Sequence, residues 1–192
     1  VDEVYRDFHP KRLTSIAGLP DMKRRTFVFN GFSKSYFMMG LRTGYVAGPA
    51  KIIEHVKQLS YVVALCPSYL GQIAALAAFD CPRSQIEPLY AEFHRSLELL
   101  FDRVSRLPGV HCVQPACGLY IFPNVSCTGM TSLELSLDLI READVITLPG
   151  TEFGPAGEGH LRLSVCAGGE HVQLGVQRLE ERLTALSSSL SR

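Results

Sequence analysis

One lysine stands in a setting that could make its amine reactive. Lys34 follows a short apolar run, residues 26–30, and it is flanked by the hydroxyls of Ser33 and Ser35. The apolar residues 37–39 come shortly after it. A lysine held among such segments is partly desolvated, which favours the neutral and nucleophilic amine. Such an amine can form a Schiff base with a carbonyl compound, whereas most loop lysines are solvated surface charges.

Three other side chains could complete a cofactor site with Lys34. Asp2 and Tyr5 lie in the opening stretch, which we interpret as the end of a strand, and Arg42 lies at the start of a second candidate strand. Ligands of α/β sheets bind beyond the carboxyl ends of strands, so these residues are expected to meet there. An acid, a phenol, a lysine and an arginine suit the ring nitrogen, ring oxygen, aldehyde and phosphate of pyridoxal phosphate.

The segments that must position these residues alternate between strand and helix patterns. Residues 26–30 predict a buried strand, 31–39 a loop or turn, and 41–48 a second strand. Helices are predicted over 50–59 and 68–79, and the near-complete apolarity of the second predicts burial on several sides. The remaining predicted segments are a helix at 84–107, paired strands at 110–113 and 118–122, a helix at 131–143 with Thr131 and Glu134 as its capping box, a strand at 145–148, a Gly-rich loop at 151–159, a strand at 161–165 and a helix at 170–186. This order predicts an α/β protein.

Composition excludes several classes of function. A length of 192 residues suits one domain or two small ones, and 46% hydrophobic residues are enough for a folded core. The formal net charge of zero gives no support for a nucleic-acid or anionic-membrane partner, and no apolar run approaches the roughly 20 residues of a membrane span. The cysteines and histidines are dispersed, with no CxxC or HExxH pattern, so we expect no metal site and a cytoplasmic protein.

The chain resembles the carboxyl-terminal half of the class I and II pyridoxal-phosphate aminotransferases, the fold-type-I superfamily of aspartate aminotransferase. Its segments appear in the order of that family: Asp2–Tyr5, Ser33–Lys34 with 40–45, 115–122, 148–150 with 153–154, and 161–164. The segment around Lys34 is the specific part of this pattern. The resemblance implies that residues 1–82 are a remnant of the large cofactor-binding domain, with a mixed sheet and helices, and that 83–192 are the smaller carboxyl-terminal α/β domain.

The resemblance also implies a role for each site residue. Lys34 would be the Schiff-base lysine and the base that moves the substrate proton. Asp2 would pair with the pyridinium nitrogen, and Tyr5 would bond the ring oxygen. Arg42 and Ser33 would bind the phosphate. Arg162 would bind the substrate α-carboxylate through two hydrogen bonds. The implied activity is transfer of an amino group between an amino acid and a 2-oxo acid, by a protein that is a homodimer at full length.

Three positions depart from the family pattern. Gly31 stands where many relatives have Ser, Phe37 where they have a small residue, and Thr43 where they have an aliphatic one. The first half of the family is also absent from the sequence, so we interpret the chain as a fragment that binds cofactor poorly by itself. Two alternatives stay open: a pyridoxal-phosphate-dependent carbon–sulfur lyase of the same fold, and a truncated module without catalytic activity. The pattern does not identify the amino acid substrate.

Overall fold

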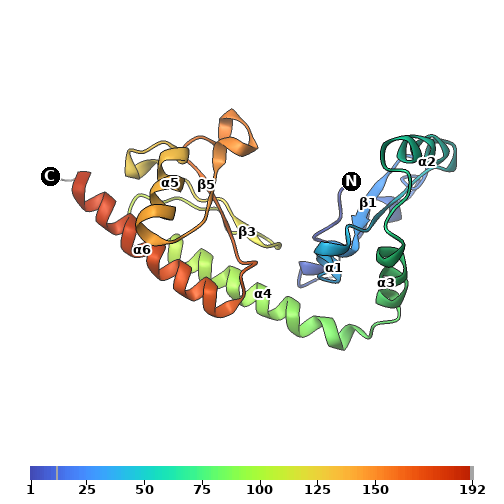
Figure 1. Cartoon of the computed structure of the whole chain (residues 1–192), viewed down its shortest axis with the longest axis horizontal. Coiled ribbons are helices and arrows are strands. Elements are labelled where there is room, and N and C mark those ends of the chain that lie inside the picture. The colour runs from blue at the N-terminus through green and yellow to red at the C-terminus, as the bar shows by residue number, and fades with distance from the viewer. Residues whose placement is uncertain (12, 191–192) are drawn as a thin grey trace. The chain divides into compact units, whose positions relative to one another are not determined.

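The structure, a computed structural model, describes residues 1–11 and 13–190 and has an α/β architecture (Figure 1). The chain divides into two compact units, Val1–Glu87 and Pro88–Arg192, which are described separately below. This division falls inside the helix α4 (Arg83–Val104), whereas the predicted domain boundary lies at its start. Among the described helices, none has the length and apolarity needed to cross a membrane.

A β-hairpin organises the first unit. The strands β1 (Val28–Gly31) and β2 (Gly44–Ala47) pair antiparallel, in a register that runs from Val28 opposite Ala47 to Gly31 opposite Gly44. Asp2 forms a parallel bridge with Phe29, so the opening residues lie beside β1. The connection between the strands, predicted as a loop or turn, holds the short helix α1 (Phe32–Ser35) and the 3-10 turn η3 (Met39–Leu41). The connection is therefore built on one helical turn, and Lys34 lies within it.

Two helices follow the hairpin, α2 (Ala50–Ala64) and α3 (Tyr69–Phe79), and both were predicted (Figure 1). The predicted burial of α3 is wrong, because Leu70 is 73% exposed and Leu76 63% exposed. The buried residues of α3 are the small ones, Gly71, Ala75 and Ala78. The strand predicted at 26–30 forms as β1, but its predicted burial is wrong in part, since Phe29 is 52% exposed. Apolarity predicts burial only where another element covers the surface, and no described element covers the outer side of α3.

The second unit packs helices on a small antiparallel sheet. Its strands are β3 (Tyr120–Ile121), β4 (Leu148–Pro149) and β5 (Leu161–Ser164), in the order β3-β5-β4. After the shared helix α4, the helices are α5 (Ser132–Ala143) and α6 (Gly169–Leu190), which contact each other. The core residues that are 0–2% exposed include Val104, Ile121, Leu135, Leu139, Leu161, Val165 and Val176. The shorter 3-10 turns of the chain are η1 (Arg6–Phe8), η2 (Ile16–Gly18), η4 (Ser126–Thr128), η5 (Gly150–Phe153) and η6 (Pro155–Gly157).

The strand pairing predicted for the second unit is wrong. Residues 110–113 form no strand and contribute one isolated bridge, from His111 to Asn124, while β3 pairs with β5. The register places Ile121 opposite Leu163, and both side chains are buried. Pairing with β5 therefore brings two buried apolar side chains together, which the local turn pattern could not reveal. The capping box of α5 is confirmed by hydrogen bonds in both directions between residues 131 and 134.

Candidate active site

A pocket of about 210 Å³ lies at the end of the β1–β2 hairpin. Its lining residues are Val4, Asn30, Gly31, Ser33, Lys34, Arg42, Thr43 and Gly44. Three of the residues predicted to bind a cofactor, Ser33, Lys34 and Arg42, are thus brought together. The described lining holds two cationic side chains and two hydroxyls, with no carboxylate. This combination suits a phosphate or another small anion.

The position of Lys34 follows from the short helix α1. The helix begins directly after β1, and the Phe32 amide donates to the Thr43 carbonyl at 3.1 Å, which ties the helix to the opposite side of the hairpin. Lys34 is half-buried, and its Nζ lies 5.6 Å from the centroid of the Tyr5 ring. A lysine at that distance from an aromatic face makes a cation–π contact when it is charged. Tyr5 therefore lies beside Lys34, and its predicted bond to a ring oxygen remains a prediction.

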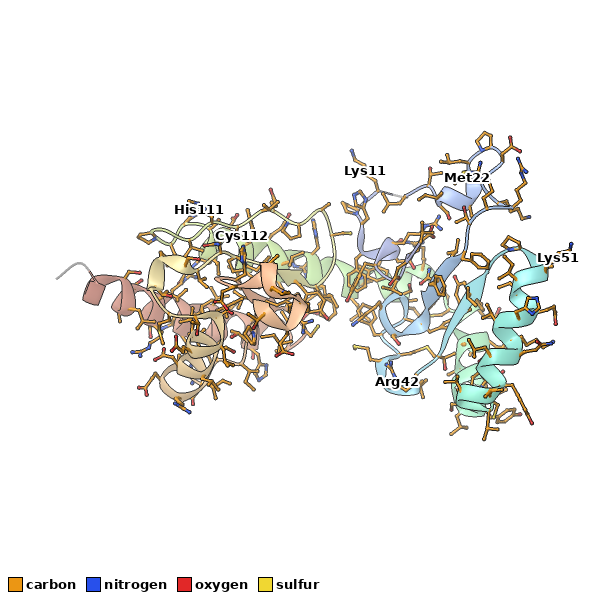
Figure 2. All side chains as sticks on the ribbon, turned by 90° about the horizontal axis from the view of Figure 1, so that it is seen from above. Lys11, Met22, Arg42, Lys51, His111 and Cys112 are labelled. Atoms are coloured by element: carbon orange, nitrogen blue, oxygen red, sulfur yellow. The ribbon has the colours of Figure 1, made fainter. Side chains whose placement is uncertain are left out.

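Arg42 is presented by a turn with an unusual backbone. Its φ of 52° lies in the left-handed region, and its Nη1 donates to the Met39 carbonyl at 2.8 Å. Thr43, the next residue, is buried, and its hydroxyl donates to the Leu41 carbonyl at 3.1 Å. Arg42 is itself exposed, and Figure 2 shows it on this turn ahead of β2. The turn is thus fixed by hydrogen bonds while the guanidinium remains accessible to an anion.

Asp2 lies beside β1 and is not among the described residues that line the pocket. It is exposed, and its Oδ1 accepts from the Val4 amide at 3.0 Å. Its bridge to Phe29 keeps it beside β1, the strand that leads to Lys34. The predicted pairing of Asp2 with a ring nitrogen remains a prediction.

Burial and a neighbouring charge act on the phenol next to α1. Tyr36 follows the helix, and its ring lies 5.6 Å from the Phe32 ring. Desolvation by burial raises the pKa of Tyr36, and the negative charge of Asp7 raises it further. Both effects favour the neutral form of the Tyr36 phenol, which packs beside the helix that carries Lys34.

Arg162, in the second unit, lies between two aromatic rings. Its Cζ is 4.5 Å from the Tyr120 centroid and 5.1 Å from the Phe153 centroid. Its Nε is buried and has no hydrogen-bond partner among the described residues. Stacking orients the flat guanidinium, and an unpartnered buried N–H leaves it ready for a ligand. A carboxylate is the natural bidentate partner of such a group.

Comparison with known proteins identifies the family. The sequence pattern of the family "Aminotransferase class I and II" matches residues 1–178 of this chain. The chain belongs to the class I and II aminotransferases. Members of this family are generally dependent on pyridoxal phosphate. The family resemblance drawn from the segments around Asp2, Lys34 and Arg162 is therefore confirmed.

Several aminotransferases share the sequence and the fold. An aspartate aminotransferase of Pyrococcus abyssi is 38% identical over 95% of this chain and 48% of its own length. Aromatic-amino-acid aminotransferase 2 of Thermococcus litoralis is 37% identical, with the same two coverages. The crystal structure of an aromatic aminotransferase from Pyrococcus horikoshii OT3 matches with a TM-score of 0.87 and 37% identity, over 96% of this chain and 50% of that one. The chain thus spans about half the length of the aminotransferases it matches.

Sequence reasoning missed contacts around two of the predicted site residues, Arg162 and Arg42. Tyr120 and Arg162 share one face of the sheet because Tyr120 lies opposite Ser164, two residues from Arg162, and only the register shows this. Gly71 of α3 was also missed, although it faces the Arg42 turn. A Cβ at Gly71 would lie 2.1 Å from the Thr43 hydroxyl oxygen. The available signal was a glycine inside an apolar helix, which usually has a packing reason.

Proposed function

We propose that this chain is the lysine-bearing part of a pyridoxal-phosphate-dependent aminotransferase, which moves an amino group between an amino acid and a 2-oxo acid. The observation that carries the proposal is the pocket that gathers Lys34, Ser33 and Arg42 in a member of this family. The donor set also fits the cofactor, because the pocket is cationic and holds hydroxyls but no carboxylate. A phosphate would therefore meet charge-assisted donors without a repelling neighbour.

Each site residue of the chain would have its own role, set by the chemistry of its side chain. Pyridoxal phosphate, when bound, supplies a carbonyl carbon and a ring that withdraws electrons from the substrate. The Lys34 amine would hold this group, and Nζ would afterwards move the proton of the substrate's α-carbon. The Arg42 guanidinium and the Ser33 hydroxyl would bind the phosphate. Tyr5, beside Lys34, would bond the ring oxygen, and Asp2 would pair with the ring nitrogen.

Arg162 would bind the carboxylate of the substrate. The support is its orientation between Tyr120 and Phe153 and the buried Nε that lacks a partner among the described residues. A carboxylate that accepts from Nε and one Nη would satisfy this N–H and form two parallel charge-assisted hydrogen bonds. Lysine keeps the charge but cannot form that fork, so an Arg162→Lys variant separates charge from geometry.

We also propose that the longer protein is a homodimer and that α2 and α3 contribute to buried surface in it. Residues 58–79 contain no charged side chain, and Val62 and Val63 are 79% and 76% exposed. Monomeric proteins rarely expose apolar patches above a few hundred Å². Tyr61, Tyr69 and Leu70 of these helices are also at least 67% exposed, which supports coverage of this surface by another part of the protein.

The test adds the part of a related aminotransferase that this chain does not cover. A chimera would join the unmatched half of the P. abyssi aspartate aminotransferase to this chain, and transfer from aspartate to 2-oxoglutarate would be measured. The proposal predicts turnover that Lys34→Ala abolishes and Lys51→Ala leaves intact, and a raised KM in Arg162→Lys. Incubation with cysteine tests the lyase alternative, because release of sulfide, ammonia and pyruvate without amino transfer would identify a carbon–sulfur lyase. A folded chimera that binds no pyridoxal phosphate would contradict the proposal.

A further inference from the structure

Phe37 occupies a backbone conformation that bulky residues rarely adopt. Its φ is 55°, in the left-handed region, where a β-carbon crowds the following carbonyl. Its amide donates to the Lys34 carbonyl at 3.3 Å, so the strained residue belongs to the turn that carries the lysine. Strain of this kind persists only where the surroundings hold the residue in place, and it clusters at functional sites. Glycine would relieve the strain, so the presence of a phenylalanine needs a reason.

The ring of Phe37 begins a chain of aromatic contacts that returns to Lys34. It packs edge-on against Phe8, with centroids 5.9 Å apart and planes at 71°. Phe8, which is 7% exposed, packs edge-on against Tyr5 at 6.0 Å and 66°. The Tyr5 ring in turn lies 5.6 Å from the Lys34 Nζ. These contacts join the turn after Lys34 to residues 5–8, which are distant in the sequence.

We propose that Phe37 is a positioning residue that holds the Tyr5 ring beside the Lys34 amine through Phe8. The importance of this contact for catalysis rests on the proposed function, in which Lys34 is the reactive lysine. The edge-on packing offsets the backbone strain, and the strained backbone aims the Phe37 ring at Phe8. Without that ring Phe8 loses one aromatic neighbour, and the segment that carries Tyr5 is held less firmly against the lysine.

The contact itself can be measured without cofactor. In NMR spectra of the whole chain with labelled lysine, the ring current of Tyr5 should shift the resonances of the Lys34 side-chain methylenes. Loss of this displacement in Tyr5→Leu would assign it to the Tyr5 ring. The displacement should disappear in Phe37→Gly, persist in Phe37→Tyr, and persist in Phe29→Leu, a change at an exposed aromatic of the same unit. Phe37→Leu, which fills the space without an aromatic face, replaces Phe37→Gly if that variant does not fold. An unchanged displacement in the folded variant would overturn the proposal.

The reactivity of the lysine gives a second readout. Pyridoxal phosphate and borohydride label accessible amines, and Lys51 at the start of α2 serves as an internal reference in the same digest (Figure 2). The ratio of adduct at Lys34 to adduct at Lys51 should fall about three- to ten-fold in Phe37→Gly, as expected from the loss of one aromatic pair, and recover in Phe37→Tyr. Equal ratios in the wild type and Phe37→Gly would overturn the proposal. A wild-type chain that shows the NMR displacement but no preference for Lys34 would contradict the proposed function and leave the positioning contact established.

Discussion

Substitution of Gly71 by Ala tests how α3 supports the turn that carries Arg42. A Cβ at this position would lie 2.1 Å from the Thr43 hydroxyl oxygen and 2.9 Å from the Leu41 carbonyl oxygen. Both distances are too short for a real contact, and the second neighbour is backbone. The turn that carries Arg42 must therefore move, or α3 must move away from it.

The cost can be worked out from the atoms involved. Overpacking in a filled contact destabilises by about 1–3 kcal/mol. Displacement of the Thr43 hydroxyl would also break its 3.1 Å hydrogen bond to the Leu41 carbonyl, which contributes about 1 kcal/mol to stability. Alanine recovers about 1 kcal/mol through its higher helix propensity. The expected net loss for Gly71→Ala is therefore about 1–3 kcal/mol.

Gly175→Ala is the matched control. Gly175 lies inside α6, and its Cβ would meet nothing within 4 Å, so this variant is expected to gain about 0.5–1 kcal/mol. Urea unfolding gives the stabilities, and hydrogen exchange over residues 39–44 reports on the turn. Gly71→Ala should exchange faster there and lose more affinity for pyridoxal phosphate than for pyridoxal, which lacks the phosphate. A stabilised Gly71→Ala with unchanged exchange would refute this reasoning.

Three further substitutions test the second unit. Thr131→Ala removes the cap of α5 and should lower the stability to urea by about 1 kcal/mol, whereas an unchanged midpoint would show that the cap contributes little. Leu135→Ala empties a fully buried position and should cost about 3 kcal/mol, and a loss under 1 kcal/mol in urea would contradict the packing described for it. The hydrogen bonds from Arg182 hold the pKa of Asp138 below its ordinary value, so this pair stabilises the fold above about pH 4 and loses its effect as the pH falls through the folded pKa. Asp138→Asn should therefore cost about 1 kcal/mol at pH 7, after allowance for solvent screening, and progressively less as the pH falls below about 4, and a cost that does not fall with pH would contradict the linkage.

Local patterns predicted the parts of this fold that depend on neighbouring residues. The Thr131 cap depends on a side chain three residues away, and it was predicted correctly. The residue types around Lys34 indicated a reactive amine because its flanking strands and hydroxyls are close in sequence. The family resemblance rested on such short segments, and their order along the chain was enough to establish it.

The predictions that failed depend on contacts between distant segments. The apolarity of α3 suggested burial, yet Leu70 and Leu76 face outward because no described element covers that side. The pairing of β3 with β5 depends on a register between segments that are far apart in the chain. The position of the Tyr120 ring beside Arg162 follows from the same register, so no local pattern could reveal it. Tertiary partners, which local spacing does not encode, decide these features.

Mapping of the borohydride-trapped pyridoxal phosphate adduct tests the central claim most directly. The whole chain is mixed with the cofactor, reduced and digested, and the modified lysines are identified by mass. Weak binding is expected of a chain that spans about half of its relatives, so the measured quantity is selectivity. We predict that Lys34 is labelled in preference to the exposed Lys51 and Lys57, and that Arg42→Gln removes this preference. Labelling that follows exposure alone, with Lys34 no more modified than these two, would contradict the account.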